Sequence, residues 1–157
     1  MITVTSFNVR QNEIDKMNIV YHPYYARWFE LGRMDFFRKA GLSNSSIINK
    51  GFYLPLSQIE CRYKSPAQYG DQIAVYTGVT YMSCVKLKFE YTILNRVTEK
   101  VIAVGSTVHA WTDKQIRPVN IEKEAPEIYN LLKDYVNNDI KIEEKGCVLE
   151  QNSSVCL

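Results

Sequence analysis

Alternating hydrophobic and polar positions predict a sheet over much of the chain. Residues 2–9 alternate loosely and predict a first strand. Four longer strand candidates follow at residues 53–63, 73–81, 85–93 and 101–111. In the third of these, Lys86, Lys88 and Glu90 fall on the face opposite the apolar positions. The connections between the four are short, which favours an antiparallel meander.

Residues 23–41 predict a long helix that is apolar on nearly all of its sides. Pro23 suits a first helical position, because its missing N–H would have no partner there. Gly41 suits the position just after a helix. Apolar or small residues surround most of the circumference: Tyr24, Tyr25, Trp28, Phe29, Leu31, Gly32, Met34, Phe36 and Phe37. Such a helix must be covered on several sides, and Gly32 indicates a close approach by a neighbouring element.

These elements together predict an α+β fold. One strand, one buried helix and four long strands suggest a twisted antiparallel sheet curled around that helix. Residues 125–136 predict a second, amphipathic helix at the periphery. We expect a single domain over residues 1–137, followed by a tail over residues 138–157 whose structure the sequence does not reveal.

Composition narrows the functional classes. A net charge of +2 argues against nucleic-acid or membrane binding. No apolar run reaches the ~20 residues of a membrane helix, and the first residues do not resemble a signal peptide. The four cysteines lack CxxC spacing and only two histidines are present, so we expect no metal site. A reducing, cytoplasmic setting fits this cysteine usage best.

The candidate chemistry lies just before the long helix. Asp15 precedes His22 and Pro23 by a short loop. A helix start leaves backbone N–H groups without intrahelical acceptors, so the amides of His22, Tyr24 and Tyr25 are candidate donors to an oxyanion. A carboxylate beside such donors could serve as nucleophile or general base in acyl transfer.

The order of the predicted elements and three sequence motifs resemble those of the hotdog-fold thioesterases, in particular the 4-hydroxybenzoyl-CoA thioesterase-like acyl-CoA hydrolases. The resemblance covers about residues 3–119. Its motifs are "DKMNIVYHPYYARWFE" from Asp15, "YKSPAQYGD" from Tyr63 and "VHAWTDKQIRPV" from Val108. Asn18 departs from the glycine that relatives often carry, although asparagine tolerates the left-handed conformation that such a turn needs.

The resemblance implies a hotdog fold and hydrolysis of an acyl-CoA to a free acid and CoA, with CoA as part of the substrate and no cofactor. Asp15 matches the family's catalytic carboxylate, and the backbone N–H of His22 matches the donor that polarises the thioester carbonyl. The family also implies a homodimer or homotetramer with active sites between subunits.

Other interpretations of these residues stay open. Asp15 could be a turn or capping residue, and Glu13 is a rival carboxylate. The His22 side chain could bind substrate, assist protonation or orient the turn. His109 is expected to be structural. Glu30 and Arg33 could form an ion pair one helical turn apart.

Four cations are candidates for binding the phosphates of CoA: Arg62, Lys64, Lys86 and Lys88. Exposed lysines on strands are more often simply solvated. The functional alternatives are hydrolysis of acyl-carrier-protein thioesters and a non-catalytic acyl-binding hotdog module. The module would keep the fold and lose the acid, so Asp15 argues against it. A hotdog dehydratase fits less well, because its histidine and acid are expected on different elements.

Overall fold

A computed structural model describes residues 1–137 of the chain, so the predicted tail over residues 138–157 lies outside the described part. The strands are β1 (Ile2–Asn8), β2 (Leu56–Tyr63), β3 (Gln72–Met82), β4 (Lys86–Asn95) and β5 (Val101–Ala110). The helices are η1 (Gln11–Glu13), α1 (Pro23–Lys39), α2 (Asn44–Asn49), α3 (Ile121–Glu124) and α4 (Pro126–Lys133). The predicted α+β class and both predicted helices are confirmed, whereas the short α2 escaped prediction because it spans less than two turns.

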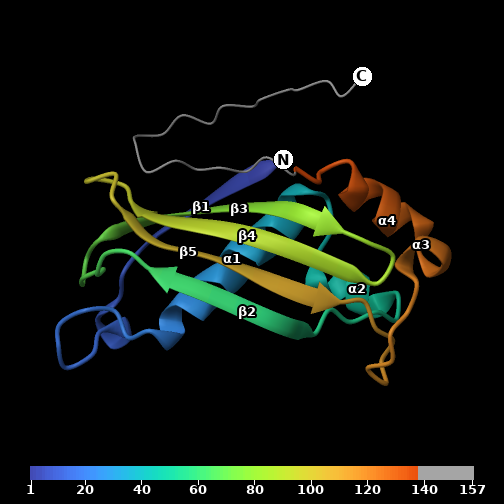
Figure 1. Ribbon diagram of the computed structural model, residues 1–157, viewed down its shortest axis with the longest axis horizontal. Helices are drawn as coiled ribbons and strands as arrows, with labels where there is room; N and C mark the ends of the chain where they lie inside the picture. The colour runs from blue at the N-terminus through green and yellow to red at the C-terminus, as the bar shows by residue number, and fades with distance from the viewer. Residues whose placement is uncertain (138–157) are drawn as a thin grey trace.

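The five strands form one antiparallel sheet in the order β1-β3-β4-β5-β2 (Figure 1). The predicted meander is therefore right for β3, β4 and β5 but wrong for β2, which pairs with β5 instead of β3. The reason lies in residues 64–71, which cross one end of the molecule rather than turning back. Backbone bonds from Val20 N to Ala67 O and from Val9 N to Asp71 O, both 2.9 Å long, fix this crossing.

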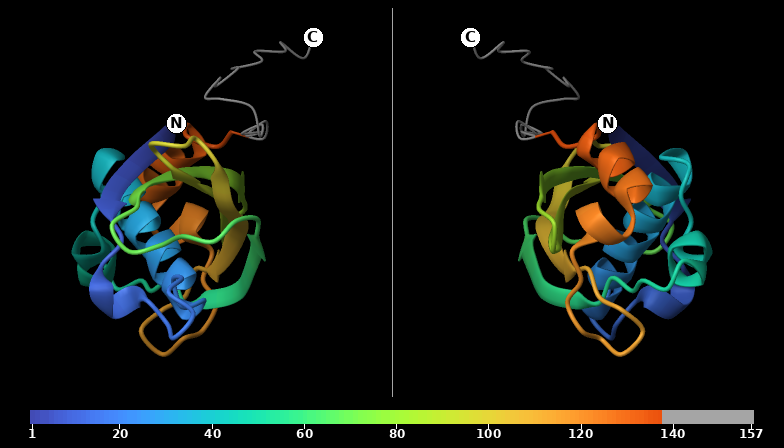
Figure 2. Two further views of the ribbon diagram at one scale, coloured as in Figure 1. Left: turned by 90° about the vertical axis from the view of Figure 1, so that its left-hand side faces the viewer. Right: turned by 90° about the vertical axis from the view of Figure 1, so that its right-hand side faces the viewer.

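The sheet curls around α1, the arrangement that defines the hotdog fold (Figure 2). Trp28, Phe29 and Phe36 are fully buried on the helix. Two glycines allow the close contact. A side chain on Gly32 would collide with Thr77 of β3, and one on Gly105 of β5 would collide with the ring of Phe29. The close approach predicted at Gly32 is thus confirmed.

A bulge in β3 turns the Tyr81 side chain outward, although strict alternation along this strand would place it on the buried face. A bulge between Val79 and Tyr81 shifts the register of β3 against β4. Val79 is fully buried, whereas Tyr81 is 52% exposed. The extra residue reverses the side-chain alternation, so the buried face of the strand ends at Val79 and does not include Tyr81.

The two ends of the described chain meet beside β3. The Met1 amino group lies 3.3 Å from the Tyr135 carbonyl oxygen. The Asn137 N–H donates to Val79 O at 2.8 Å, one residue beyond the point where Ile2 pairs with Gly78. Among residues 1–137, no helix is both long and apolar enough to cross a bilayer.

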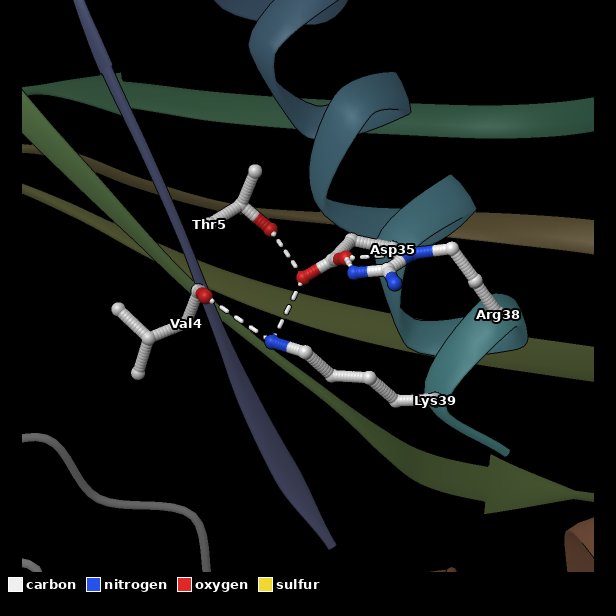
Figure 3. A network of polar contacts seen from close by, with 5 residues as sticks. All are labelled: Val4, Thr5, Asp35, Arg38 and Lys39. Carbon is white, nitrogen blue, oxygen red and sulfur yellow. Dashed lines mark hydrogen bonds and ion pairs between the residues drawn. The ribbon is translucent and has the colours of Figure 1, made fainter. Parts of the chain in front are cut away.

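A carboxylate fastens the end of α1 to the edge strand β1 (Figure 3). Asp35 accepts hydrogen bonds from Thr5 at 3.0 Å and from Arg38, and forms an ion pair with Lys39 at 2.8 Å. Lys39 also donates to the Val4 carbonyl at 3.1 Å. Partial burial opposes ionisation of Asp35, but the bonds from Lys39, Arg38 and Thr5 outweigh it and lower the pKa of this carboxyl group.

We predict that Asp35→Asn lowers the free energy of unfolding by about 1 kcal/mol at neutral pH. Because the folded-state pKa is depressed, this contribution is present above the unfolded pKa of about 3.9 and is lost as pH falls through the folded value. Urea titrations of both proteins across this pH range measure the difference. Asp134→Asn, which alters an exposed carboxylate, is the control. A difference that persists unchanged at the lowest pH would contradict this account.

Candidate active site

The loop that carries Asp15 folds back on itself immediately before α1. Ile14 and Val20 form an antiparallel bridge, and the Tyr21 N–H donates to Glu13 O at 2.9 Å. Asn18 takes a positive φ of 62°, so asparagine does supply the left-handed turn residue. The loop thereby brings Asp15 beside the residues that lead into the helix.

Backbone amides hold one oxygen of the Asp15 carboxylate. Its Oδ1 accepts a hydrogen bond from Met17 N at 2.7 Å and a longer one from Ile19 N at 3.4 Å. Its Oδ2 accepts no hydrogen bond from residues 1–137. Asp15 is half-buried. One oxygen is thus fixed by its own loop while the other is available to a reactant.

The start of α1 offers one free backbone donor rather than three. His22 has helical dihedral angles of −53° and −31°, and its N–H donates to no acceptor within residues 1–137. Tyr24 N donates to Tyr21 O at 3.0 Å and Tyr25 N donates to His22 O at 3.2 Å. The expectation that Tyr24 and Tyr25 supply free donors is therefore wrong, because the first turn closes through bonds to the third preceding residue.

A cavity of about 300 Å³ opens beside this helix start. It is lined by Ile19, Val20, His22, Tyr25, Tyr63, Lys64, Ser65 and Pro66. Tyr25 and Tyr63 pack edge to face with ring centres 5.0 Å apart. Burial raises the pKa of Tyr25 to about 12, so this wall of the cavity stays uncharged. Asp15 lies outside the lining itself, next to it through its bond to Ile19.

The four candidate cations do not gather at this cavity. Lys64 lines it, but Arg62 and Lys88 point to the outer face of the sheet, where they pair with Glu60 and Glu90 at 3.0 Å. Tyr63 faces the helix, so the alternation of a strand turns Arg62 away. Lys86 begins β4 at the opposite end of the sheet, paired with Ala110. The four cations therefore do not lie together at this cavity, although Arg62 and Lys88 both line a second hollow on the outer face of the sheet.

Glu13, the rival carboxylate, has a structural role. It is buried and accepts hydrogen bonds from Arg10 N at 2.8 Å and from Trp28 Nε1 at 3.2 Å. His109 is also buried, as expected of a structural histidine, and lies far from Asp15 in the fold at the other end of β5.

Glu30 pairs with Arg27 and not with Arg33, so the predicted pair is wrong. Arg33 turns instead toward the sheet.

The sequence motif that begins at Tyr63 was noted as a family motif, but the sequence did not show that its residues line the cavity beside α1. Ser65 and Pro66 were missed as lining residues, and only the position of the "YKSPAQYGD" motif after a strand could have found them. Within residues 1–137, no three histidine, cysteine, aspartate or glutamate side chains gather as metal ligands would. The arrangement offers a carboxylate, an N–H donor at a helix start and an apolar cavity, which together suit attack on an activated carbonyl.

Comparison with known proteins supports this interpretation. A family model described as the thioesterase-like superfamily matches residues 9–133. YneP of Bacillus subtilis, named provisionally as an acyl-CoA thioesterase, is 32% identical over 127 residues, which cover 80% of this chain and 91% of the relative. The chloroplastic acyl-acyl carrier protein thioesterase ATL3 of Arabidopsis thaliana is 26% identical over 113 residues, which cover 72% of this chain and 60% of that protein.

Solved structures agree with the fold. The DHNA-CoA thioesterase of Staphylococcus aureus superposes with a TM-score of 0.81 at 26% identity. The match covers 85% of this chain and 89% of that one. A hypothetical protein of Thermus thermophilus superposes with a TM-score of 0.79 at 27% identity, covering 87% and 99% of the two chains.

Proposed function

The chain belongs to the thioesterase-like superfamily of thioester hydrolases, and we propose that it cleaves acyl-CoA thioesters to a free carboxylic acid and CoA through Asp15 and the start of α1. The observation that carries this proposal is that one carboxylate oxygen of Asp15 and the N–H of His22, seven residues later at the helix start, both have no hydrogen-bond partner among residues 1–137. These two groups provide the attacking or base function and the oxyanion donor that thioester hydrolysis requires.

The chemistry needs little more than these two groups. Attack on the thioester carbonyl carbon moves the carbonyl π electrons onto oxygen, where the His22 N–H and the positive end of the α1 dipole stabilise the negative charge. Collapse of this intermediate expels CoA as a thiolate. A free thiol has a pKa of about 8.5, so this leaving group departs without a strong acid and then takes up a proton.

Asp15 can act in two ways that the products alone do not distinguish. As a nucleophile it forms an acyl–aspartyl anhydride, which water then hydrolyses to the acid and the carboxylate. As a general base it removes a proton from the water that attacks the thioester directly. Single turnover in isotopically labelled water separates them, because label can enter the Asp15 carboxylate only through the anhydride.

A carrier-protein thioester is a second candidate substrate, favoured by the similarity to ATL3. The reacting thioester and its pantetheine arm are the same in both substrates. Lys64 at the cavity is the described cation placed to meet an anionic group of either one. The His22 side chain is exposed beside the cavity and would contact the substrate there.

We predict that Asp15→Asn lowers kcat/KM for acyl-CoA hydrolysis by about 10²- to 10⁴-fold. The amide retains an acceptor for Met17 N, so the loop keeps its bond, but it can neither attack nor accept a proton from water. Release of CoA thiol from a panel of fatty and aromatic acyl-CoA substrates is the measurement. Asp113→Asn is a matched control, since Asp113 accepts backbone N–H groups in a turn at the opposite end of β5.

Equal activity of the wild type and Asp15→Asn would contradict the role of Asp15. Release from carrier-protein substrates alone would favour the second candidate. Binding of acyl thioesters without hydrolysis of either class would favour the acyl-binding module.

We also propose that two copies pair along β2 to form a homodimer. Among residues 1–137, the outer edge of β2 pairs with no other strand. Leu56, Ile59 and Tyr63 of this strand face the helix side, opposite residues of β5, yet remain 52%, 44% and 55% exposed. An unpaired apolar edge is a template for another strand, and two-fold pairing would cover these side chains beside the cavity.

We predict that Ile59→Lys converts this dimer to a monomer, because the pairing would bury an uncompensated charge. Sedimentation velocity or light scattering measures the mass. Val4→Lys is the control, since Val4 lies on the opposite edge strand and is 39% exposed. A dimer that survives Ile59→Lys and dissociates with Val4→Lys would place the interface on the other edge.

A further inference from the structure

Arg33 is a half-buried cation without an anionic partner in the described chain. It points from α1 toward the sheet, where Nη1 lies 3.4 Å from His109 Nε2. No carboxylate of residues 1–137 forms an ion pair with it, although seven other lysines and arginines of this part of the chain are so paired. A guanidinium group carries five N–H donors, so one long contact with His109 and a hydrogen bond to Tyr91 leave most of them unused.

The groups around Arg33 are neutral and already hydrogen-bonded to one another. His109 Nδ1 lies 3.1 Å from Leu54 O and its Nε2 lies 3.0 Å from Thr107 Oγ1, which is 2.7 Å from the Tyr91 hydroxyl. Burial, reinforced by the charge of Arg33, lowers the pKa of His109 to about 4. Burial raises the pKa of Tyr91, against the hydrogen bonds of Thr107 and Arg33. None of these groups compensates the positive charge.

Arg33 lies on the same face of α1 as the proposed oxyanion donor. His22 already has helical dihedral angles, and eleven residues at ~100° each return to within about 20° of the starting direction. The rise of ~1.5 Å per residue separates the two Cα atoms by about 16 Å. A long side chain on a helix leans toward the N-terminus, so the guanidinium lies nearer to His22 than this figure. Between them on this face lie the small, exposed Ala26 and the fully buried Phe29.

The same side of the molecule carries exposed apolar side chains. His109, which Arg33 contacts, pairs across the sheet with Leu56 at the start of β2. Along β2, Leu56, Ile59 and Tyr63 face the helix side and remain exposed. Tyr63 belongs to the cavity beside His22. An apolar strip therefore runs from the proposed oxyanion donor at one end to the free cation at the other.

We propose that Arg33 binds a carboxylate at the far end of the acyl group, so that this enzyme selects monothioesters of dicarboxylic acids over those of simple fatty acids. This inference rests on the proposed thioesterase function. The thioester carbonyl lies at the His22 N–H, the methylene chain lies along Ala26 and the β2 strip, and the terminal carboxylate meets the unused guanidinium donors. Pairing of two copies along β2 would close over the chain and exclude water from the ion pair, which strengthens it.

The test compares substrates that differ only at the far end. Octanoyl-CoA and the CoA monothioester of octanedioic acid are assayed side by side, with longer and shorter dicarboxylic monothioesters to find the best length. We expect wild type to favour the dicarboxylic substrate by roughly 10- to 100-fold in kcat/KM, the range of a hydrogen bond to a charged group. Arg33→Gln removes this preference, and Arg33→Lys, which keeps the charge, retains part of it.

Arg27→Gln is the matched control, because Arg27 is an exposed arginine of α1 that pairs with Glu30 and points away from the strip. It should keep the wild-type ratio of the two substrates. Equal kcat/KM values for both substrates in wild type, or a preference that survives Arg33→Gln, would overturn the role of Arg33. Failure of wild type to cleave any thioester would instead overturn the proposed function.

Discussion

The close contact between α1 and the curled sheet is the constraint on which the rest of the structure depends. An aromatic helix that is apolar nearly all round can be buried only if a surface surrounds it. Gly32 and Gly105 make this possible by removing a side chain where the helix meets β3 and where Phe29 meets β5. The sheet can then wrap around the helix (Figure 2).

The position of the candidate site follows from this packing. The start of α1 leaves the sheet among the loops that connect the strand ends, where the His22 N–H has no acceptor among residues 1–137. The crossing segment of residues 64–71 and the Asp15 loop are bonded to the same region through Val20. The helix thus fixes the proposed donor, while two short loops hold the candidate carboxylate and the cavity in the same region.

Patterns within one element predicted the helices and strands well, whereas the pairing of one element with another was harder to predict. Proline, glycine and the apolar circumference were sufficient to place α1, and the turn around Asn18 was anticipated from its side chain. The partner of β2 depended on where residues 64–71 lead, and no local pattern encodes that path. The loss of the Tyr24 and Tyr25 donors has a similar origin, since it depends on how tightly the first helical turn closes.

The candidate site shows the same division between local and tertiary information. Asp15 and His22 were chosen as candidates because a motif carries them together in sequence. The four candidate cations do not gather at the cavity because nearness in sequence ignores the alternation of a strand, which sends Arg62 outward while Tyr63 faces the helix. Arg33 was assigned to a surface pair with Glu30 because helical spacing allows it, whereas its environment is set by His109, 76 residues later in the chain.

The meeting of Met1 with Tyr135 has a consequence for the connectivity of the fold. The described chain ends beside the point at which it begins, and both ends border the same strand. The order of the elements is therefore nearly cyclic, and a short linker from residue 137 to residue 1 would leave every strand pairing intact. New termini could then open in the exposed hairpin turn at residues 96–100 (Figure 1), so the same architecture is reachable by a circularly permuted gene.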